Sequence, residues 1–264
     1  MHIDRELIAR VEHSAAAFSC QQAEALNRLD PSVGAAAARL DGGALISFGP
    51  GRYVNRAMGL GFGGTPADEI VAELDRFYSS RAMAPSLEIG PWADANLLPA
   101  LRDAGYQLER FRNVYARDLT SLPAEPDADI VRVDALTAGD RKSILAGDVP
   151  ADSEARRISD EYCDAASDVA GSVDLLALIE GVAAACGSLN PIDGVGWLGG
   201  VATRSEQRGK GLQTALLHYR LRLAPHVGCT VAAATALPDG QSARNLERLG
   251  FKLLYTQVVL TKSH

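Results

Sequence analysis

The chain has 264 residues, of which 47% are hydrophobic and 22% charged, so it has enough apolar residues for one large domain or two modest ones. Its net charge of −7 argues against nucleic acid as a partner and favours a cationic acceptor such as an amine. No apolar run is long enough to span a membrane, and residues 1–18 carry charges throughout, so we expect neither a membrane protein nor a signal peptide.

The cysteine pattern points away from metal binding and from disulfides. The chain has four cysteines, Cys20, Cys163, Cys186 and Cys229, and none belongs to a Cys-x-x-Cys pair or clusters with histidine. We therefore expect no metal site, reduced thiols and a cytoplasmic protein.

The first half of the chain alternates predicted helices and strands. Apolar residues at helical spacing predict helices over residues 5–29, 70–78 and 96–104. Strands are predicted at residues 44–48, 53–58, 86–89 and 111–119. Thr65 and Pro66 are typical of a helix N-terminus, and the glycine-rich segment 59–64 lacks the G-x-G-x-x-G spacing. We interpret that segment as a connection rather than a dinucleotide loop.

The second half follows a polar, proline-bearing segment, residues 121–129, which is the predicted linker. The predicted domains are therefore residues 1–120 and 130–264. Strands are predicted at residues 130–133, 173–179, 182–189, 197–203, 230–237 and 251–260, with a loop at 190–194. Helices are predicted at residues 137–146, 152–170, 211–225 and 242–249.

A basic, glycine-containing turn opens the helix predicted at residues 211–225. The first amides of a helix have no intrahelical partner and carry the positive end of its dipole. Gly209 and Gly211 let the backbone approach a bulky anion, and Arg208 and Lys210 add positive charge, so a pyrophosphate would fit. On spacing alone, two glycines that serve only the backbone turn are an equally good interpretation.

The segment Arg208-Gly209-Lys210-Gly211-Leu212-Gln213 resembles the R/Q-x-x-G-x-G/A signature of the GCN5-related N-acetyltransferase (GNAT) superfamily, whose turn holds the pyrophosphate of acyl-coenzyme A. Gln213 departs from the family's Gly or Ala, and an outward-pointing side chain is tolerated there if the backbone is helical. A second segment, residues 242–251, is similar to the GNAT segment in which a short helix ends in Gly-Phe. The two matches cover roughly the last third of the chain.

The first half of the chain contains a segment that resembles part of the second match, residues 242–251, less closely. Residues 101–107, with a helix that stops at Gly105 before an aromatic residue, resemble residues 247–252, in which Gly250 plays the same part. The two glycines are 250 − 105 = 145 residues apart, which is the length of one GNAT domain. A common helix C-cap would give the same pattern. The resemblance implies an α/β fold of two GNAT-like domains, each a mixed β-sheet flanked by helices, with a degenerate N-terminal copy.

The resemblance also implies the coenzyme-binding residues. Backbone groups for the pantetheine arm would come from Val201, Ala202 and Thr203. Amides for the pyrophosphate would come from Gly209, Lys210, Gly211, Leu212, Gln213 and Thr214. The side chains of Arg208 and Lys210 would reach the phosphates or remain solvated.

The catalytic residues are less well defined. Many GNAT enzymes have a tyrosine acid four residues before the Gly of Gly-Phe, and here that position is Leu246. The alternative hydrogen-bond donors are Asn245 and Tyr255, and Asn245 would also contact the pantetheine arm. The competing interpretation of Asn245 is an ordinary polar contact within its helix, and that of Tyr255 is a core tyrosine whose hydroxyl is already hydrogen-bonded. Glu161 and Asp164 lie in the region that frames the acceptor pocket in the family.

The function implied is N-acetyl transfer from acetyl-CoA to a small-molecule or peptide amine by direct attack. Two alternatives stay open: a non-catalytic acyl-CoA-binding or regulatory module, and a nucleotide-binding α/β protein that uses the same turn for another phosphate.

Overall fold

The computed structural model describes residues 1–52 and 54–262, and the chain separates into two compact units. The first unit comprises Met1–Ala116 and the segment that begins at Thr235, and the second unit comprises Arg117–Ala234. The sequence-based division assigned everything after residue 130 to one domain. In the structure the described residues from Thr235 onward belong to the first unit instead, because their strand pairs there.

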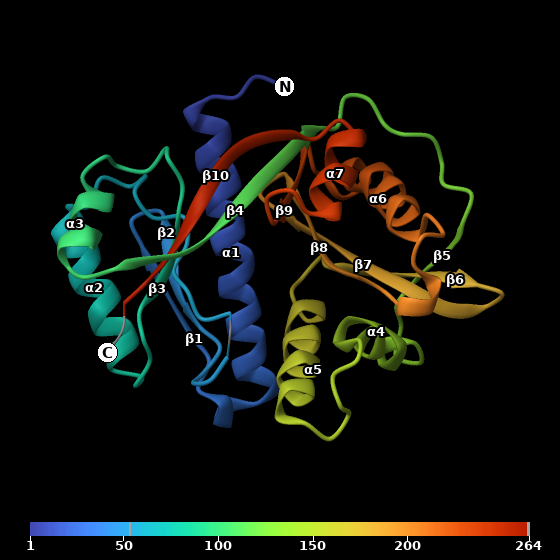
Figure 1. The fold of residues 1–264 in the computed structure, drawn as a ribbon, viewed down its shortest axis with the longest axis horizontal. Coiled ribbons are helices and arrows are strands. Elements are labelled where there is room, and N and C mark those ends of the chain that lie inside the picture. Colours follow the sequence, from blue (N-terminus) through green and yellow to red (C-terminus); the bar gives the residue numbers. More distant parts are fainter. Residues whose placement is uncertain (53, 263–264) are drawn as a thin grey trace. The chain divides into compact units, whose positions relative to one another are not determined.

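The first unit begins with the long helix α1, Arg5–Leu29, which packs on a two-stranded hairpin (Figure 1). The Asp4 carboxylate caps the helix by accepting from the Leu7 amide at 2.9 Å. The hairpin strands are β1, Ala36–Leu40, and β2, Gly43–Ser47. The sequence did not predict β1. The strand predicted at residues 53–58 begins outside the described residues, and residues 54–58 form only isolated bridges at Ala57 and Met58.

The rest of the first unit is a three-stranded antiparallel sheet with helices α2, Ala67–Ser79, α3, Leu97–Asp103, and α7, Gln241–Arg248. Its strands are β3, Ser86–Ile89, β4, Gln107–Asp118, and β10, Lys252–Thr261. The last strand, β10, lies between β3 and β4. Buried apolar side chains from α2, α3 and β3 form the core. The predicted cap Thr65 lies outside α2, whose N-cap is Pro66 with no side-chain hydrogen bond.

The second unit is built on five strands in the order β9-β8-β7-β6-β5, antiparallel except for the parallel pair β8 and β9. Their bounds are Asp129–Arg132 for β5, Val173–Ile179 for β6, Val182–Ile192 for β7, Val195–Thr203 for β8 and Val231–Ala236 for β9. The predicted loop at 190–194 is wrong in part, because β7 runs to Ile192 and turns at Asp193 and Gly194. A mixed sheet flanked by helices confirms the predicted fold class.

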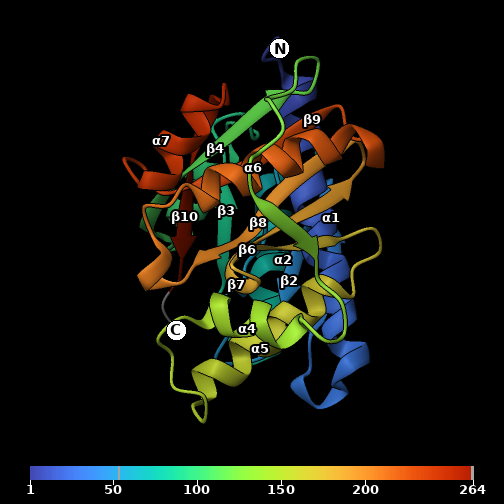
Figure 2. The same cartoon turned by 90° about the vertical axis from the view of Figure 1, so that its right-hand side faces the viewer.

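Helices cover both faces of the second unit's sheet (Figure 2). Helix α6, Leu212–Leu223, packs against the face that carries Leu175 and Ala177. Helix α4, Ala138–Ala146, packs through Ile144 against Leu176, which points the other way because side chains alternate along a strand. Helix α5, Glu154–Ser167, packs on α4. Within the described part of the chain, no helix has both the length and the apolar character needed to cross a bilayer.

Candidate functional site

The turn between β8 and α6 is open. Gly209 and Gly211 both have a φ of 78°, in the left-handed region, and a Cβ on either would meet no atom within 4 Å. Among the described residues, the backbone N–H groups of Gly209, Lys210 and Gly211 have no acceptor. Arg208 and Lys210 are exposed, and Lys210 Nζ donates to Gln207 Oε1 at 2.8 Å. The predicted anion corner is therefore not closed by side chains.

The N-terminus of α6 also lacks the groups that normally stabilise a helix end. It has no side-chain cap, which is also true of α2, α3, α4 and α7, and unlike α2 and α4 it has no acidic residue in its first turn. The charges nearest to it along the chain are the cations Arg208 and Lys210, which the positive end of the helix dipole disfavours. An anion bound at this end would satisfy the amides and both cations.

The strand before the turn has an unpaired edge. β8 pairs with β9 only from Val195 to Trp197, so its later residues have no strand partner on that side within the second unit. The predicted residues Val201, Ala202 and Thr203 lie on this stretch, at the end of β8 that leads into the turn. One edge of this stretch pairs with β7 and the other edge is open. Such an edge suits an extended polar chain that pairs with backbone groups.

β8 also contains a bulge next to these residues. Cys186 of β7 pairs with Ala202, but Ser188 pairs with Gly199, so one intervening residue of β7 faces two of β8. Two buried arginines, Arg141 and Arg220, contact the strands here. Neither arginine was predicted from the sequence, although Arg220 follows Leu212 and Leu216 at helical spacing and so lies on the buried stripe of α6.

The predicted acceptor-side carboxylates line a pocket of about 520 Å³ at α5 and the segment before it. Glu161 and Asp164 both line it, together with Asp152, Glu154 and Asp160. Both carboxylates are already paired with cations, because Arg157 contacts Glu161 at 2.5 Å and Lys142 contacts Asp164 at 2.6 Å. Neither carboxylate is therefore free of a partner within the chain.

Asn245 and Tyr255, predicted as hydrogen-bond donors, belong to the first unit, whereas the turn belongs to the second. The Asn245 amide oxygen accepts from Gln241 Nε2 at 2.8 Å, within α7. Tyr255 is buried and its hydroxyl is hydrogen-bonded to Glu12, and burial with the neighbouring carboxylates raises the pKa of Tyr255 well above its usual value. Their catalytic role stays a prediction.

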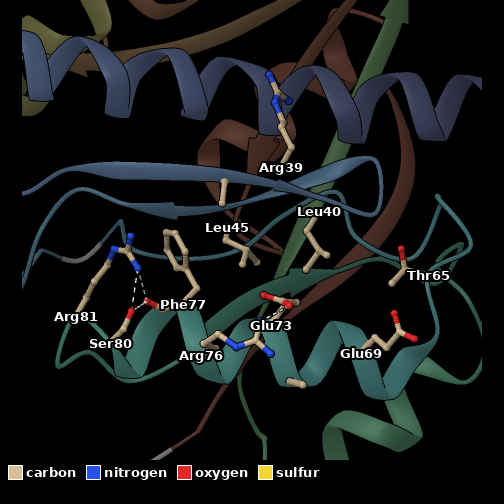
Figure 3. A pocket seen from close by; sticks show the side chains of 12 residues that line it. Arg39, Leu40, Leu45, Thr65, Glu69, Glu73, Arg76, Phe77, Ser80 and Arg81 are labelled. Atoms are coloured by element: carbon tan, nitrogen blue, oxygen red, sulfur yellow. Dashed lines mark hydrogen bonds and ion pairs between the residues drawn. The ribbon is translucent and has the colours of Figure 1, made fainter.

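A second pocket, of about 490 Å³, lies in the first unit between β1 and α2 (Figure 3). Its floor includes Leu40, Leu45 and Phe77, and Arg81 stacks over the Phe77 ring at 3.9 Å. None of the predicted site residues lines it. In residues 1–52 and 54–262 no group of three or more His, Cys, Asp or Glu residues is placed to hold a metal ion, and burial raises the pKa of the Cys163 and Cys186 thiols to about 11.

Residues 143–251, which contain the open turn, the unpaired edge of β8 and α6, match the sequence profile of the acetyltransferase (GNAT) family. They form a GNAT family domain. No curated protein sequence matches the chain. The GNAT domain spans most of the second unit and ends in the first, at Phe251.

Solved structures share the fold over most of the chain. A GCN5-related N-acetyltransferase from Kribbella flavida is 20% identical, with 95% of this chain and 96% of that chain covered and a TM-score of 0.66. A tandem GNAT protein from the clavulanic acid biosynthesis pathway is 16% identical, with 82% and 72% covered and a TM-score of 0.56. A GNAT-family acetyltransferase from Colwellia psychrerythraea is 13% identical, with 83% and 76% covered and a TM-score of 0.53.

Proposed function

We propose that the GNAT domain binds acetyl-CoA and transfers its acetyl group to an amine by direct attack. The observation that carries the proposal is the uncapped, open N-terminus of α6, which two cations precede in sequence and which suits a pyrophosphate. The unpaired edge of β8 at residues 201–203 suits the pantetheine arm, whose amides can pair with backbone groups as a strand would.

Acetyl transfer requires the chain mainly to position acetyl-CoA and the amine and to help remove a proton from the amine. Acetyl-CoA supplies an activated thioester. The leaving thiol, with a pKa near that of cysteine at ~8.5, needs little help from an acid at neutral pH. The amine needs more, because an alkylammonium with a pKa of ~10.4 loses its proton at pH 7 at a cost of roughly 4.6 kcal/mol. A base or a water chain is therefore the more valuable group, and the absence of a tyrosine at Leu246 is tolerable.

The acceptor we propose is a small-molecule or peptide amine. The net charge of −7 favours the approach of a cation. The pocket at α5 is rich in carboxylates, which favours an amine over an acidic acceptor. The proposed compartment is the cytoplasm, where the four free, buried cysteines are stable as thiols.

We further propose that the first unit contains a degenerate GNAT copy. Three pairs of elements start 145 residues apart. They are α2 at Ala67 and α6 at Leu212 (212 − 67), β3 at Ser86 and β9 at Val231 (231 − 86), and β4 at Gln107 and β10 at Lys252 (252 − 107). A shared offset over consecutive elements supports a duplication more strongly than one helix-Gly-aromatic match does.

The turn before α2 differs from the turn before α6 in one respect that matters for binding. The Asp41 carboxylate accepts from the Gly61 amide at 2.6 Å and from the Thr65 amide at 2.8 Å. A Cβ on Gly63 would lie 2.7 Å from Asp41 Oδ1, so this carboxylate fills the turn. Because the chain supplies its own anion there, we propose that the first unit takes no pyrophosphate and that each chain binds one CoA.

Calorimetry with CoA, ATP and NAD tests the proposal. We expect binding of CoA alone, and we expect Gly211→Glu to abolish it because a carboxylate would occupy the anion position. Gly211→Asn is the matched control, since asparagine tolerates the left-handed backbone and brings no charge. Gly228→Glu, at a glycine with a φ of 83° beyond the other end of α6, controls for strain. Unchanged CoA affinity in Gly211→Glu would refute the site.

Thiol release with a panel of amines then separates catalysis from binding. An acyl-CoA-binding module without activity is favoured by one observation, the buried apolar Leu246 where many GNAT enzymes have a tyrosine. CoA binding without thiol release for any amine would support that alternative.

A further inference from the structure

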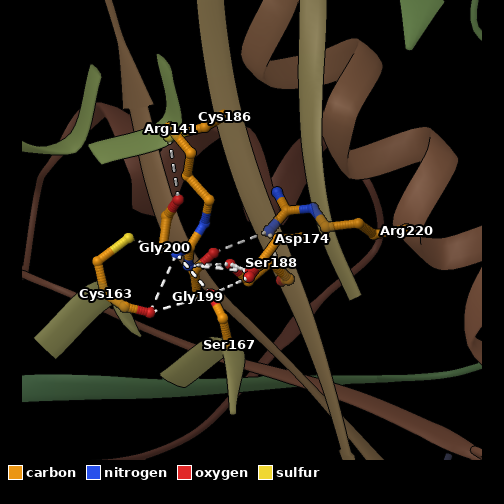
Figure 4. Close-up of polar contacts among 9 residues, drawn as sticks. All are labelled: Arg141, Cys163, Ser167, Asp174, Cys186, Ser188, Gly199, Gly200 and Arg220. Carbon is orange, nitrogen blue, oxygen red and sulfur yellow. Dashed lines mark hydrogen bonds and ion pairs between the residues drawn. The ribbon is translucent and has the colours of Figure 1, made fainter. Parts of the chain in front are cut away.

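Two buried arginines reach the bulge of β8 from opposite faces of the second unit's sheet (Figure 4). Arg220, on α6, is 0% exposed, and Arg141, on α4, is 2% exposed. Fully buried cations are rare in proteins because water solvates them far better than an apolar interior does. Both side chains are therefore held there by the contacts that they make.

Arg220 donates to backbone carbonyls on both strands at the bulge. Its Nη1 donates to Ser188 O at 3.1 Å and to Gly199 O at 3.4 Å, and its Nε donates to Leu216 O at 3.0 Å. Gly187 makes room for it, since a Cβ there would lie 3.1 Å from Arg220 Cζ. The planar guanidinium thus joins β7, β8 and α6 at one point.

Arg220 has no carboxylate partner among the described residues. Burial lowers the pKa of its guanidinium to about 10, so it is still protonated at neutral pH. The charge is thus retained for its hydrogen bonds to the two carbonyls rather than for an ion pair.

Arg141 holds the same bulge from the other face. Its Nη2 contacts Asp174 Oδ1 at 2.9 Å and donates to Ser188 Oγ at 3.0 Å, and the Ser188 hydroxyl in turn donates to Asp174. Gly200 lies against this group with a φ of 57°, and a Cβ on it would lie 2.5 Å from Ser188 Oγ. Only glycine fits at this point of the bulge.

We propose that Arg220 and Arg141 are positioning residues that fix the β8 bulge at residues 199–201, and so fix the backbone of residues 201–203 that meets the coenzyme arm. This inference rests on the proposed function. Without the bulge, residues from 201 onward would shift by one against β7 and point to the opposite faces of the sheet. The two arginines therefore set which backbone groups of β8 face the unpaired edge.

Arg220→Met, Arg220→Lys and the control Arg222→Met test the role of Arg220. Arg222 lies on the same helix and donates to Pro123 O, away from the bulge. We expect Arg220→Met to weaken CoA binding by at least about tenfold and to speed amide hydrogen exchange at residues 199–202, because mispositioned groups lose most of their binding energy. Lysine should not restore either property, since one ammonium cannot replace the planar fork, and Arg222→Met should match the wild type.

Gly187→Ala keeps every donor and covers the case in which Arg220→Met does not fold. Its Cβ would push the guanidinium by a few tenths of an ångström, and we expect CoA affinity to fall by about threefold with faster exchange at the bulge. Two outcomes would overturn the inference. One is an Arg220→Lys protein with wild-type CoA affinity and wild-type amide exchange at residues 199–202. The other is a Gly187→Ala protein whose amides at the bulge exchange faster but whose CoA affinity is unchanged. If the wild type binds no CoA, the proposed function fails by itself, and unchanged exchange at residues 199–202 in Arg220→Met would still refute the positioning role.

Discussion

Glu12 makes the stability of the first unit depend on pH. It is buried under the sheet, and burial, with a contribution from the charge of Glu88, raises the pKa of Glu12 from 4.5 to about 7. Glu88 is itself held by Arg56 at 2.6 Å, by Arg112 and by Gln257 at 2.8 Å. The folded protein therefore keeps a proton on Glu12 in the pH range in which the unfolded chain has lost it.

The size and sign of the effect follow from linkage. A carboxyl whose pKa is raised on folding contributes stability that is complete below about 4.5 and is lost as pH rises through about 7. A shift from 4.5 to about 7 corresponds to about 3 kcal/mol at 1.36 kcal/mol for each pKa unit. Glu12→Gln keeps the shape of the protonated acid and cannot ionise, so we expect it to match the wild type at pH 4.5 and to be more stable by about 3 kcal/mol at pH 8.

The assay is urea denaturation at several pH values between 4.5 and 8. The chain has two tryptophans, Trp92 in the first unit and Trp197 in the second, so a Trp197→Phe background reports on the first unit through Trp92 fluorescence. Glu24→Gln is the matched control, because Glu24 is exposed on the same helix. A difference between Glu12→Gln and the wild type that stays constant across this pH range would refute the reasoning.

Three further predictions concern the glycine of the bulge, the number of coenzyme sites and the buried tyrosine. Gly200→Ala should lower the free energy of unfolding of the second unit by about 1–3 kcal/mol, measured by urea denaturation followed by Trp197 fluorescence. Gly139→Ala is the control, because a Cβ there meets no atom, and it should not lower this free energy. Equal effects of the two substitutions would show that the bulge does not require glycine at residue 200. Calorimetry should give one CoA per chain, and a second site that persists in Gly211→Glu would show that Asp41 does not close the other turn. Tyr255→Phe should cost about 1 kcal/mol of stability; an accompanying large fall in kcat would support the catalytic role predicted for Tyr255, and an unchanged kcat would contradict it.

Local patterns in the sequence predicted most helices and strands, and they failed where a turn decided the outcome. β1 reads Ala-Ala-Ala-Arg-Leu, which favours a helix, yet the following pair Asp41 and Gly42, with φ values of 50° and 84°, forms a tight turn that folds it back onto β2. The pair Asp193 and Gly194, with φ values of 49° and 75°, extends β7 beyond its predicted end in the same way. An Asp-Gly pair between apolar runs is the signal that would have predicted both.

The candidate site was predictable only as far as it is contiguous. The turn at residues 208–214 carries its glycines and cations within one short segment, so spacing and resemblance were enough to find it. Arg141 and Arg220 come from helices far apart in sequence, and their meeting at the bulge depends on the register of β7 and β8. The pairing of β10 with β3 and β4 is likewise a long-range choice that no local pattern encodes.

The central position of β10 has a consequence for synthesis. Residues 252–261 are translated after all the other strands described here, yet they form the middle strand of the first unit's sheet. Lys262, which follows this strand, forms an ion pair with Asp75 at 2.6 Å. A nascent chain must therefore expose the bare edges of β3 and β4 while residues 117–234 are translated, and such edges invite aggregation. The unit that contains residues 1–116 is completed only after residues 117–234 have been made, so a chain that stalls before β10 would leave this unit unfinished and open to proteolysis.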